Sequence, residues 1–289
     1  MKRPTERLRS YLALTKPTIQ LLVVLTGAAG LVVEGSLNGD PSRFTLVLLL
    51  LAMAGGSANA FNQVFERDVD ADMTRTRRRR PLPMKRIGVR EAYAFAGLVG
   101  TASIAGFWLF FNLYSALLAA GTILFYSLFY TLYLKPRTPQ NIVLGGAAGA
   151  MGPVIAWAAA ANSLAVAPWL MFAIIFFWTP PHFWTLAIYH RTDYETVGYP
   201  MMPVIIGDAR TWVQVIRYSV LMIAVSLGLL WSGLGLVYAI SAIALGGLFM
   251  RKVVQAQTSR VPKDARGVFG YSILYLLALF TMMIVDAGL

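Results

Sequence analysis

Long apolar runs alternate with short polar connections along the 289 residues of the chain. Nine of these runs are long enough for a helix that crosses a bilayer, which needs roughly 20 mostly apolar residues. None shows the strict alternation of a membrane β-strand. The pattern therefore predicts an all-α integral membrane protein with nine transmembrane helices. We expect them over residues 17–33, 44–65, 92–111, 114–134, 142–161, 167–188, 213–230, 233–250 and 268–285.

The polar connections are too short to form a soluble domain, so we expect one polytopic membrane domain over residues 1–289. Composition agrees, because 57% of the residues are hydrophobic, 13% are charged and the mean hydropathy is +0.63. Soluble globular proteins carry about 25% charged residues. The first segment, MKRPTERLRSYLALTKP, is basic but lacks the apolar core and cleavage site of a signal peptide. We expect a cytosolic amphipathic segment there.

Basic residues gather on one side of the predicted membrane. If the nine runs alternate in direction, 24 of the 25 Lys and Arg residues fall at the same set of ends, and Arg43 falls at the other. Positive charge marks the cytoplasmic side. We therefore expect a protein of the bacterial plasma (inner) membrane with its N-terminus cytoplasmic and its C-terminus outside. The net charge of +12 then reflects topology and contact with membrane lipid, and no nucleic-acid partner is expected.

The most polar stretch, NQVFERDVDADMTRTRRRRPLP, directly follows the second apolar run. Its Asn62, Glu66 and Asp70 are spaced four residues apart and drift by about 40° per step, so they form one stripe along a helix. Asp68 and Asp72 point away from it. The chain has no Cys and two His residues, and amide and carboxylate oxygens suit Mg²⁺ shared with phosphate. The alternative is a helix that becomes polar as it leaves the membrane and pairs its acids with arginines.

Basic residues follow the stripe at once. Guanidinium and ammonium groups beside metal-binding carboxylates make a site for a polyanion such as a diphosphate. The alternative is that the arginine run anchors the chain at lipid headgroups. The candidates are Arg75, Arg77, Arg78, Arg79 and Arg80, with Lys135 and Arg137 in the next connection on the same side.

These motifs resemble a known family. The stripe N-x3-E-x3-D, followed by RT and RPLP, is similar to the first metal motif of the UbiA superfamily of intramembrane prenyltransferases, with Gln63 and Glu66 in the places of two aspartates. This variant is similar to the branch of the superfamily that acts on haem. Three residues separate RT from RP, one more than is usual, so the resemblance does not choose among the arginines at 77–80. Further matches, from Tyr11 to Tyr218, are YLALTKP, LKPRTPQNIVLGGAAGAMGPVIAW, PHFW, DY and GYPMMPV.

The resemblance implies an enzyme whose nine helices surround a central cavity open to the cytoplasmic side. The implied reaction transfers a farnesyl group from farnesyl diphosphate to a vinyl group of haem B, with addition of water, and gives haem O and diphosphate. A haem A synthase is the implied downstream partner. Mg²⁺ is the implied cofactor, held by the catalytic residues Asn62, Glu66, Asp70 and Asp193. The implied diphosphate contacts are Lys16, Arg75, Arg79, Lys135 and Arg137.

A second site is implied near the end of the sixth run. The superfamily has an aspartate motif there, whereas this chain has HFWTLAIYHRTDYE, with Phe183 and His190 in the places of two aspartates. On one helix, His182, Tyr189 and Asp193 would lie within about 40° of one another. Imidazole is a usual haem ligand, and the implied haem contacts are His182, Tyr189 and His190. The alternative for His182 is a buried imidazole bonded to a neighbouring group.

Two other functions stay open. The first is a prenyltransferase of the same kind whose acceptor is a quinone precursor or another aromatic. Histidines in place of aspartates favour haem over such an acceptor. The second is a membrane transporter. Transport needs polar groups across the bilayer, and the outer halves of the runs are nearly all apolar.

Overall fold

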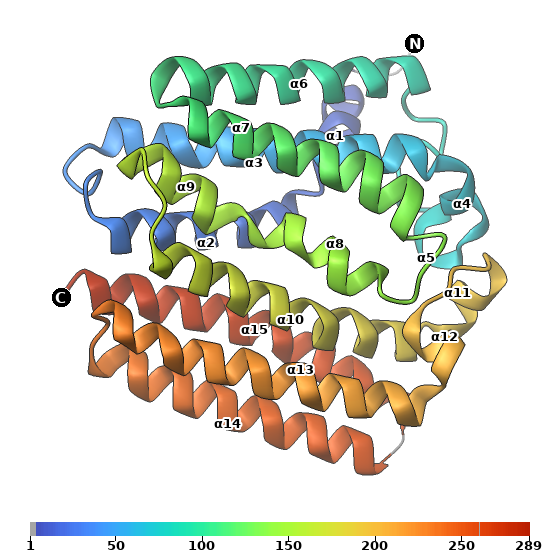
Figure 1. Ribbon diagram of the computed structural model, residues 1–289. Coiled ribbons are helices and arrows are strands. Elements are labelled where there is room, and N and C mark those ends of the chain that lie inside the picture. Colours follow the sequence, from blue (N-terminus) through green and yellow to red (C-terminus); the bar gives the residue numbers. More distant parts are fainter. Residues whose placement is uncertain (1–3, 260) are drawn as a thin grey trace.

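The computed structural model describes residues 4–259 and 261–289, and these form a helical bundle without β-strands (Figure 1). Nine helical spans in that part of the chain are long and apolar enough to cross a membrane, which confirms the predicted class and count. A helix suits this environment because it satisfies its own backbone hydrogen bonds where water is absent. The spans are Pro17–Glu34 (α2), Pro41–Phe65 (α3), Val89–Phe110 (α6), Leu113–Leu134 (α7 and η1), Asn141–Ala161 (α8 and α9), Val166–Tyr189 (α10), Asp208–Ser232 (α13 and η2), Leu236–Ser259 (α14) and Pro262–Ala287 (α15).

Three of these spans change helix type or direction along their length. The fourth widens from α7 (Leu113–Leu124) into a π-helix, η1 (Phe125–Leu134). The fifth divides into α8 (Asn141–Ala150) and α9 (Gly152–Ala161), because Pro153 has no amide hydrogen to continue the helix. The seventh tightens from α13 (Asp208–Gly228) into the 3-10 turn η2 (Leu229–Ser232). The helices outside the spans are α1 (Pro4–Thr15), α4 (Arg67–Asp72), α5 (Thr74–Arg77), α11 (Arg191–Thr196) and α12 (Met202–Ile206).

The spans pack as two groups that share one interface. Helices α3, α6, α7 and α9 surround one apolar core, and α10, α13, α14 and α15 surround another. Helix α2 packs against α3, α9 and α15, and α8 packs against α10, so the two groups form one bundle (Figure 1). Large apolar side chains cover its outside, among them Leu98, Trp231 and Leu236. An apolar outer surface is what contact with lipid tails requires.

Hydrogen bonds between buried groups fix α3 against α6. The Ser57 hydroxyl donates to the Ala96 carbonyl at 2.7 Å, and the Ser103 hydroxyl donates to the Leu50 carbonyl at 2.7 Å. A side chain at Gly100 would overlap Ser57, so glycine allows the two helices to approach closely. Helix α3 is thereby held on both halves of its length, and its polar end has a defined position.

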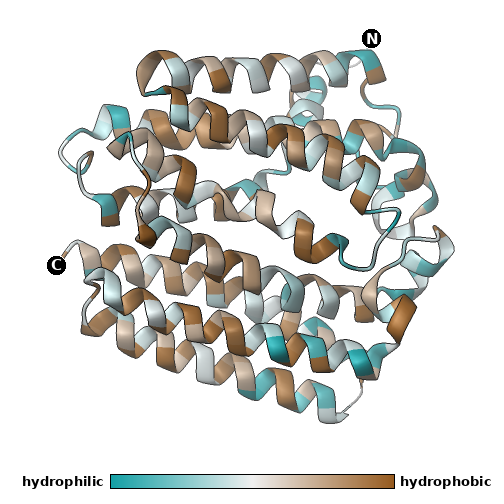
Figure 2. Cartoon of the chain, viewed as in Figure 1, coloured by the Kyte–Doolittle hydropathy of each residue, from teal (hydrophilic) through white to brown (hydrophobic). Residues whose placement is uncertain are grey.

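Polar segments gather at one end of the bundle. The short helices α4, α5, α11 and α12 all lie there, on the right in Figure 1. Figure 2 shows many hydrophilic residues in and around α4 and α11, whereas α12 is apolar, and the connections at the opposite end are short. The stretch that follows α3 belongs to this polar end.

Candidate active site

All three members of the predicted stripe are buried at the polar end of α3. Asn62 is 2% exposed, Glu66 is 4% exposed and Asp70 is 2% exposed. Helix α3 ends just before Glu66, which turns the chain into α4 and accepts the Asp70 amide on its carbonyl at 2.8 Å. Asp68 and Asp72, which do not belong to the stripe, are exposed. The fold thus buries two carboxylates and exposes two others, even though the helix is interrupted at Glu66, between α3 and α4.

Two cations neutralise the buried carboxylates. Lys135 follows η1 and pairs with Glu66. Arg80 lies in the loop after α5, pairs with Asp70 and reaches Glu66 Oε2 at 3.4 Å. Burial would raise the pKa of Glu66, but Lys135 and Arg80 hold it below its ordinary value. Burial raises the pKa of Asp70 in spite of the Arg80 guanidinium beside it. Glu66 is therefore the more firmly ionised of the two.

A third cation reaches the stripe from the break between α1 and α2. Lys16 adopts a left-handed conformation, φ 52° and ψ 65°, which is uncommon for a residue with a side chain. Its ammonium donates to Asn62 Oδ1 at 2.9 Å, and Asn62 Nδ2 donates to Thr131 Oγ1 at 3.1 Å. Burial and the nearby Arg80 guanidinium lower the pKa of Lys16 to about 7. The amide of Asn62 is thus held in one orientation from both sides.

Arg79 and Arg137, also predicted to bind diphosphate, form no ion pair with the carboxylates in the described part of the chain. Arg79 lines the cavity beside the stripe, whereas the side chain of Arg75 falls outside the described residues. Arg137 folds back, donates to two carbonyls at the end of its own helix and lies 4.7 Å over the ring of Tyr133. Among the described arginines of the run at 77–80, Arg80 is the one that forms ion pairs with the stripe.

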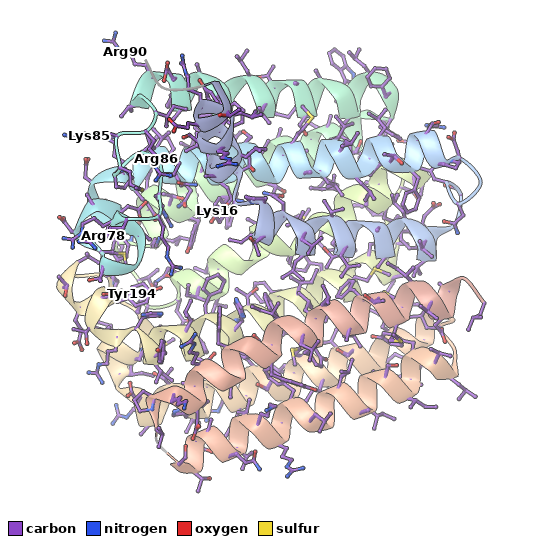
Figure 3. All side chains as sticks on the ribbon, turned by 180° about the vertical axis from the view of Figure 1, so that it is seen from behind. Lys16, Arg78, Lys85, Arg86, Arg90 and Tyr194 are labelled. Carbon is purple, nitrogen blue, oxygen red and sulfur yellow. The ribbon has the colours of Figure 1, made fainter. Side chains whose placement is uncertain are left out.

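A cavity of about 330 Å³ opens beside the stripe. Lys16 and Tyr194, both labelled in Figure 3, line it from segments far apart in the sequence. Its polar lining consists of Lys16, Asn62, Gln63, Thr76, Arg79, Arg80 and Lys135. Its aromatic lining consists of Tyr126, Tyr130, Phe183 and Tyr194. The cavity therefore joins a cationic surface to an aromatic one.

The aromatic lining depends on the π-helix η1. Amides of a π-helix bond to carbonyls five residues back, and the Lys135 amide bonds in this way to Tyr130 at 2.9 Å. The rings of Tyr126 and Tyr130 stack with centroids 5.1 Å apart, and both line the cavity. Gly145 on α8 faces the Tyr130 ring so closely that any side chain would overlap it. The glycine leaves the space in which the ring lies.

The predicted second site does not form on one helix. Helix α10 ends at Tyr189, and the chain turns at His190 before α11, so Asp193 does not continue the helix. Asp193 Oδ2 lies 3.9 Å from His190 Nδ1. The side chains of Tyr189, His190 and Asp193 do not line the cavity beside Asn62. The expectation that His182, Tyr189 and Asp193 share one helix face is therefore wrong, because the helix is shorter than that expectation needs.

His182 is packed within the apolar core. Its Nδ1 lies 2.6 Å from Ser272 Oγ, and its ring stacks between Trp178 at 4.2 Å and Phe269 at 4.5 Å. Trp178 also donates to the Ser272 carbonyl at 2.8 Å. The imidazole faces α15 instead of the cavity. His182 thus has the environment of a buried histidine that is bonded to a neighbouring group.

Asn62, Glu66 and Asp70 bring one amide and two carboxylate oxygens to one place. Such oxygens suit a hard divalent cation like Mg²⁺, which usually completes its coordination with water and phosphate. The described residues contain no group of three or more His, Cys, Asp or Glu side chains that could hold a metal. A cation here would therefore depend on the amide and on the substrate as well as on the two carboxylates. Asp193 lies outside this group of donors.

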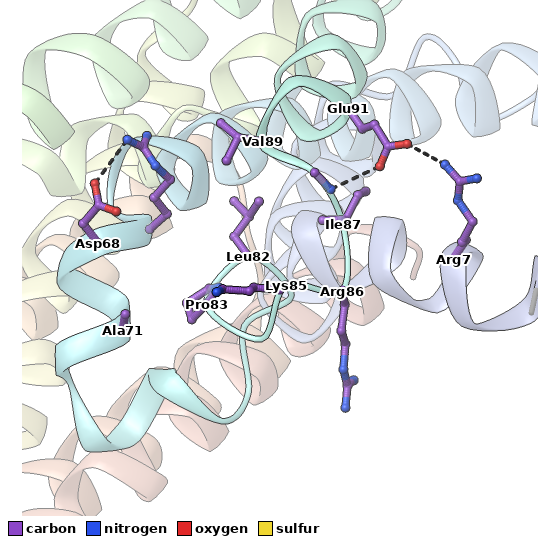
Figure 4. A pocket seen from close by; sticks show the side chains of 12 residues that line it. Arg7, Asp68, Ala71, Leu82, Pro83, Lys85, Arg86, Ile87, Val89 and Glu91 are labelled. Carbon is purple, nitrogen blue, oxygen red and sulfur yellow. Dashed lines mark hydrogen bonds and ion pairs between the residues drawn. The ribbon is translucent and has the colours of Figure 1, made fainter. Parts of the chain in front are cut away.

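A larger cavity, of about 730 Å³, lies along the loop that leads into α6 (Figure 4). Four of its charged side chains form two ion pairs, Arg7 with Glu91 at 2.6 Å and Arg67 with Asp68 at 3.2 Å. No member of the buried stripe lines it. The smaller cavity is the candidate active site because Asn62 of the stripe and the cations Lys16, Arg80 and Lys135 line it.

Three tyrosines of this site were missed in the sequence. Tyr126 and Tyr130 lie within an apolar run and Tyr194 lies in a polar connection, so a hydrophobic pattern does not distinguish them from their neighbours. The available signal was the spacing of four between Tyr126 and Tyr130, on the half of their run that leads to Lys135. For Arg80, which lay within the candidate run, the signal was its place directly before the proline of the RPLP motif.

Relatives of known activity cover nearly the whole chain. The sequence profile of the UbiA prenyltransferase family matches residues 23–281. A protoheme IX farnesyltransferase of Erythrobacter litoralis (strain HTCC2594) is 44% identical over 285 residues, which are 96% of this chain and 92% of that protein. The protoheme IX farnesyltransferase of Novosphingobium aromaticivorans is 43% identical over 284 residues, which are 96% of this chain and 93% of that protein.

Solved structures share the fold at low sequence identity. A structure of digeranylgeranylglyceryl phosphate synthase aligns with a TM-score of 0.80 at 19% identity and covers 98% of this chain and 99% of its own. A UbiA homologue from Archaeoglobus fulgidus bound to DMAPP and Mg²⁺ aligns with a TM-score of 0.66 at 17% identity, over 95% of this chain and 99% of its own. The nine-span bundle is thus the fold of these membrane enzymes.

Proposed function

The chain belongs to the UbiA prenyltransferase family, and from this premise we propose that it transfers a farnesyl group from farnesyl diphosphate to a vinyl group of haem B, giving haem O. The acceptor is supported by relatives named protoheme IX farnesyltransferase that match nearly the whole chain at 44% and 43% identity. The structural observation that carries the proposal is the buried stripe, with three cations on it and an aromatic wall beside it.

The charges of the stripe suit a diphosphate. Two carboxylates and three cations leave one surplus positive charge when all are ionised. A divalent cation would raise this surplus to the charge that balances a fully ionised diphosphate monoester. We therefore assign Asn62, Glu66 and Asp70 to hold Mg²⁺, which would neutralise the leaving diphosphate. The solved homologue bound to DMAPP and Mg²⁺ supports a divalent metal in this role.

The cations of the stripe bind the phosphate oxygens. Arg80 and Lys135 bond to the carboxylates of the stripe and Lys16 bonds to the Asn62 amide oxygen, so all three can exchange these partners for phosphate oxygens without large movement. Arg79 lines the same cavity and adds positive charge. These donors stabilise the negative charge that collects on the diphosphate as its bond to carbon breaks.

The aromatic wall serves the hydrocarbon half of the reaction. The C–O bond of farnesyl diphosphate breaks and its electrons leave with the diphosphate. The allylic carbon then bonds to the terminal vinyl carbon of haem B, and water supplies a hydroxyl to the adjacent carbon and releases a proton. The rings of Tyr126, Tyr130 and Phe183 stabilise the allylic cation by their π-faces and keep water away until the C–C bond has formed.

The acceptor side is assigned to the loop after α10. Tyr189 and His190 stay proposed haem contacts there, and the His190 side chain is 30% exposed. His182 is left out because it is packed against α15. Asp193 pairs with His190 and is proposed to orient it rather than to bind the metal.

The proposal includes a location. The nine spans place the protein in a membrane, and the segregation of basic residues supports a bacterial inner membrane with the polar end of the bundle and the cavity on the cytoplasmic side. A haem A synthase is the proposed consumer of haem O.

Product analysis tests the proposed function. Purified protein is incubated with Mg²⁺, with haem B or an aromatic quinone precursor as acceptor, and with geranyl, farnesyl or geranylgeranyl diphosphate, and the products are weighed by mass spectrometry. We expect a farnesylated, hydrated haem with the farnesyl donor, and no product after chelation of Mg²⁺. Prenylation of a quinone precursor in place of haem would contradict the acceptor. Failure to consume any prenyl diphosphate would contradict the reaction class.

A further inference from the structure

Gln63 is buried next to Asn62 but turns its amide toward another helix. Its side chain is 1% exposed. Its Nε2 donates to the Ala13 carbonyl at 3.0 Å and to the Leu14 carbonyl at 2.9 Å. Both acceptors lie at the end of α1, directly before Lys16. One side chain of the stripe helix thus holds the segment from which a cation of the site projects.

The two carbonyls need an outside donor because the chain breaks after them. In a continuous helix, the Ala13 carbonyl would accept the amide four residues on, but that residue is Pro17, which has no amide hydrogen. The Leu14 carbonyl loses its helical partner because Lys16 adopts the left-handed conformation. The first amides of α2 turn instead to the Lys16 carbonyl, from Ile19 at 2.9 Å. The Ala13 carbonyl keeps one long bond, from the Lys16 amide at 3.4 Å, whereas Leu14 is buried and its carbonyl is costly unless bonded. Gln63 donates to both carbonyls.

The break gives Lys16 its direction. A left-handed conformation at a residue with a Cβ persists where the surrounding structure determines it. Here Pro17 prevents a continuous helix, and Gln63 stabilises the carbonyls that the break exposes. The result is an ammonium at 2.9 Å from Asn62 Oδ1.

The two polar atoms of the Gln63 amide differ within the described part of the chain: the nitrogen is hydrogen-bonded, and the oxygen is not. Gln63 Oε1 is buried without a hydrogen-bond partner among the described groups. An unbonded buried oxygen is destabilising, so packing by itself would favour an apolar side chain of the same size. An amide is retained where its N–H groups have a task that offsets this cost.

We propose that Gln63 is a positioning residue, which holds the break between α1 and α2 so that the Lys16 ammonium is presented to the diphosphate of the substrate. This inference rests on the proposed function, because it takes a prenyl diphosphate as the ligand of Lys16. Gln63 lines the cavity, but both hydrogen bonds of its amide nitrogen go to α1. Its effect on substrate binding passes through Lys16.

A double-mutant cycle tests the connection. The variants are Gln63→Met, which keeps the length and removes the donor, Lys16→Met, and the two together. The readout is the dissociation constant of a non-hydrolysable farnesyl diphosphate analogue with Mg²⁺, measured by calorimetry beside the melting temperature. We expect each single variant to weaken binding by about tenfold, and the double variant to bind no more weakly than Lys16→Met, because dependent sites are not additive.

Ser57→Ala is the matched control, since Ser57 is also buried on α3 and donates to a carbonyl of another helix, but that helix is α6 and not α1. It should lower the melting temperature, leave the affinity for the analogue unchanged and add independently to Lys16→Met. If Gln63→Met does not fold, Gln63→Asn enters the same cycle, because it keeps an amide of shorter reach.

Two results would overturn the inference. Losses of affinity that multiply in the double variant would mean that Gln63 does not act through Lys16. A lower melting temperature with full affinity for the analogue would make Gln63 a structural residue. If the unsubstituted protein did not bind the analogue at all, the proposed function would fail first, and the inference with it.

Discussion

The side chains of the candidate site compensate one another's charge without a substrate. Glu66 and Asp70 are buried at 4% and 2% exposure, which a carboxylate tolerates when cations and hydrogen bonds surround it. Arg80 and Lys135 provide those partners. Each carboxylate therefore has two roles, to hold the resting site together and to bind the metal that the reaction needs.

Loss of a buried carboxylate should lower activity far more than loss of an exposed one in the same segment. We expect Glu66→Gln and Asp70→Asn each to lower kcat/KM for farnesyl diphosphate by about a hundredfold, about 2.7 kcal/mol, since both lose a charge that holds Mg²⁺. Asp68→Asn and Asp72→Asn are matched controls on the exposed side of the same segment and should stay within about threefold of the parent. Equal damage at all four positions would show that burial does not select the metal ligands.

His182 provides a second test at this scale. His182→Ala removes a ring stacked on Trp178 and Phe269 and the partner of Ser272 Oγ, so we expect a lower melting temperature. The affinity for haem B, followed by absorbance titration, should change little. His190→Ala, in the partly exposed loop, should weaken haem binding at little cost in stability. A loss of haem affinity at His182 that exceeds the loss at His190 would reverse this assignment.

Spacing along one helix was enough to predict which acidic side chains are buried together, because Asn62, Glu66 and Asp70 are close in sequence. The partners of these residues were harder to choose. Arg80 was one of four arginines in a run, and chain direction after α5 decides which of them turns inward. A turn of that kind depends on packing between segments, which a local pattern does not contain.

At the scale of elements, the π-helix η1 gives the site its aromatic wall. Its composition is that of any apolar run, so the sequence predicted a helix there without its wider turn. The end of α10 posed a similar difficulty. No Gly or Pro marks the turn at His190, and a helix continued through it would have placed Asp193 on the same face as His182. Helix type and helix ends are therefore where the prediction of the site went wrong or remained silent.

Gly145 tests the importance of the wall. In Gly145→Ala the added methyl group would overlap the Tyr130 ring, so the ring must shift within the cavity. We expect a loss of stability of about 1–3 kcal/mol, typical of overpacking, together with a higher KM for farnesyl diphosphate. Gly149→Ala is the control, because no atom lies within 4 Å of its added methyl group on the same helix. Equal effects of the two substitutions would place the damage in the helix rather than at Tyr130.

For the whole molecule, apolar patterning predicted the nine spans because each carries enough apolar residues to cross a membrane by itself. The packing of the spans into two groups was beyond the sequence, since lipid and protein neighbours are equally apolar. The longest polar connections, those that contain α4, α5, α11 and α12, nevertheless lie at one end of the bundle (Figures 1 and 2), in keeping with the segregation of basic residues.

Thiol labelling tests the orientation of the bundle. The chain has no natural cysteine, so single substitutions report one position each. In intact cells, Arg78→Cys, Glu195→Cys and Lys263→Cys should resist an impermeant maleimide, and Arg43→Cys, on the opposite side, should react. After the cells are opened, all four should react. Labelling of the first three in intact cells would invert the proposed topology.

Arg80 acts as an internal counterion of both carboxylates, and this makes the binding of metal and diphosphate a case of heterotropic cooperativity. Free Mg²⁺ must compete with a guanidinium that is always nearby, whereas a diphosphate that takes up Arg80 leaves Glu66 and Asp70 open to the metal. We expect inorganic diphosphate to tighten Mg²⁺ binding by about tenfold, about 1.4 kcal/mol, in calorimetric titrations. Linkage requires Mg²⁺ to tighten diphosphate binding by the same factor. Arg80→Met should tighten Mg²⁺ binding in the absence of diphosphate and reduce both factors to what direct contact between metal and diphosphate supplies. Unchanged Mg²⁺ affinity and unchanged factors would show that Arg80 is not the competitor.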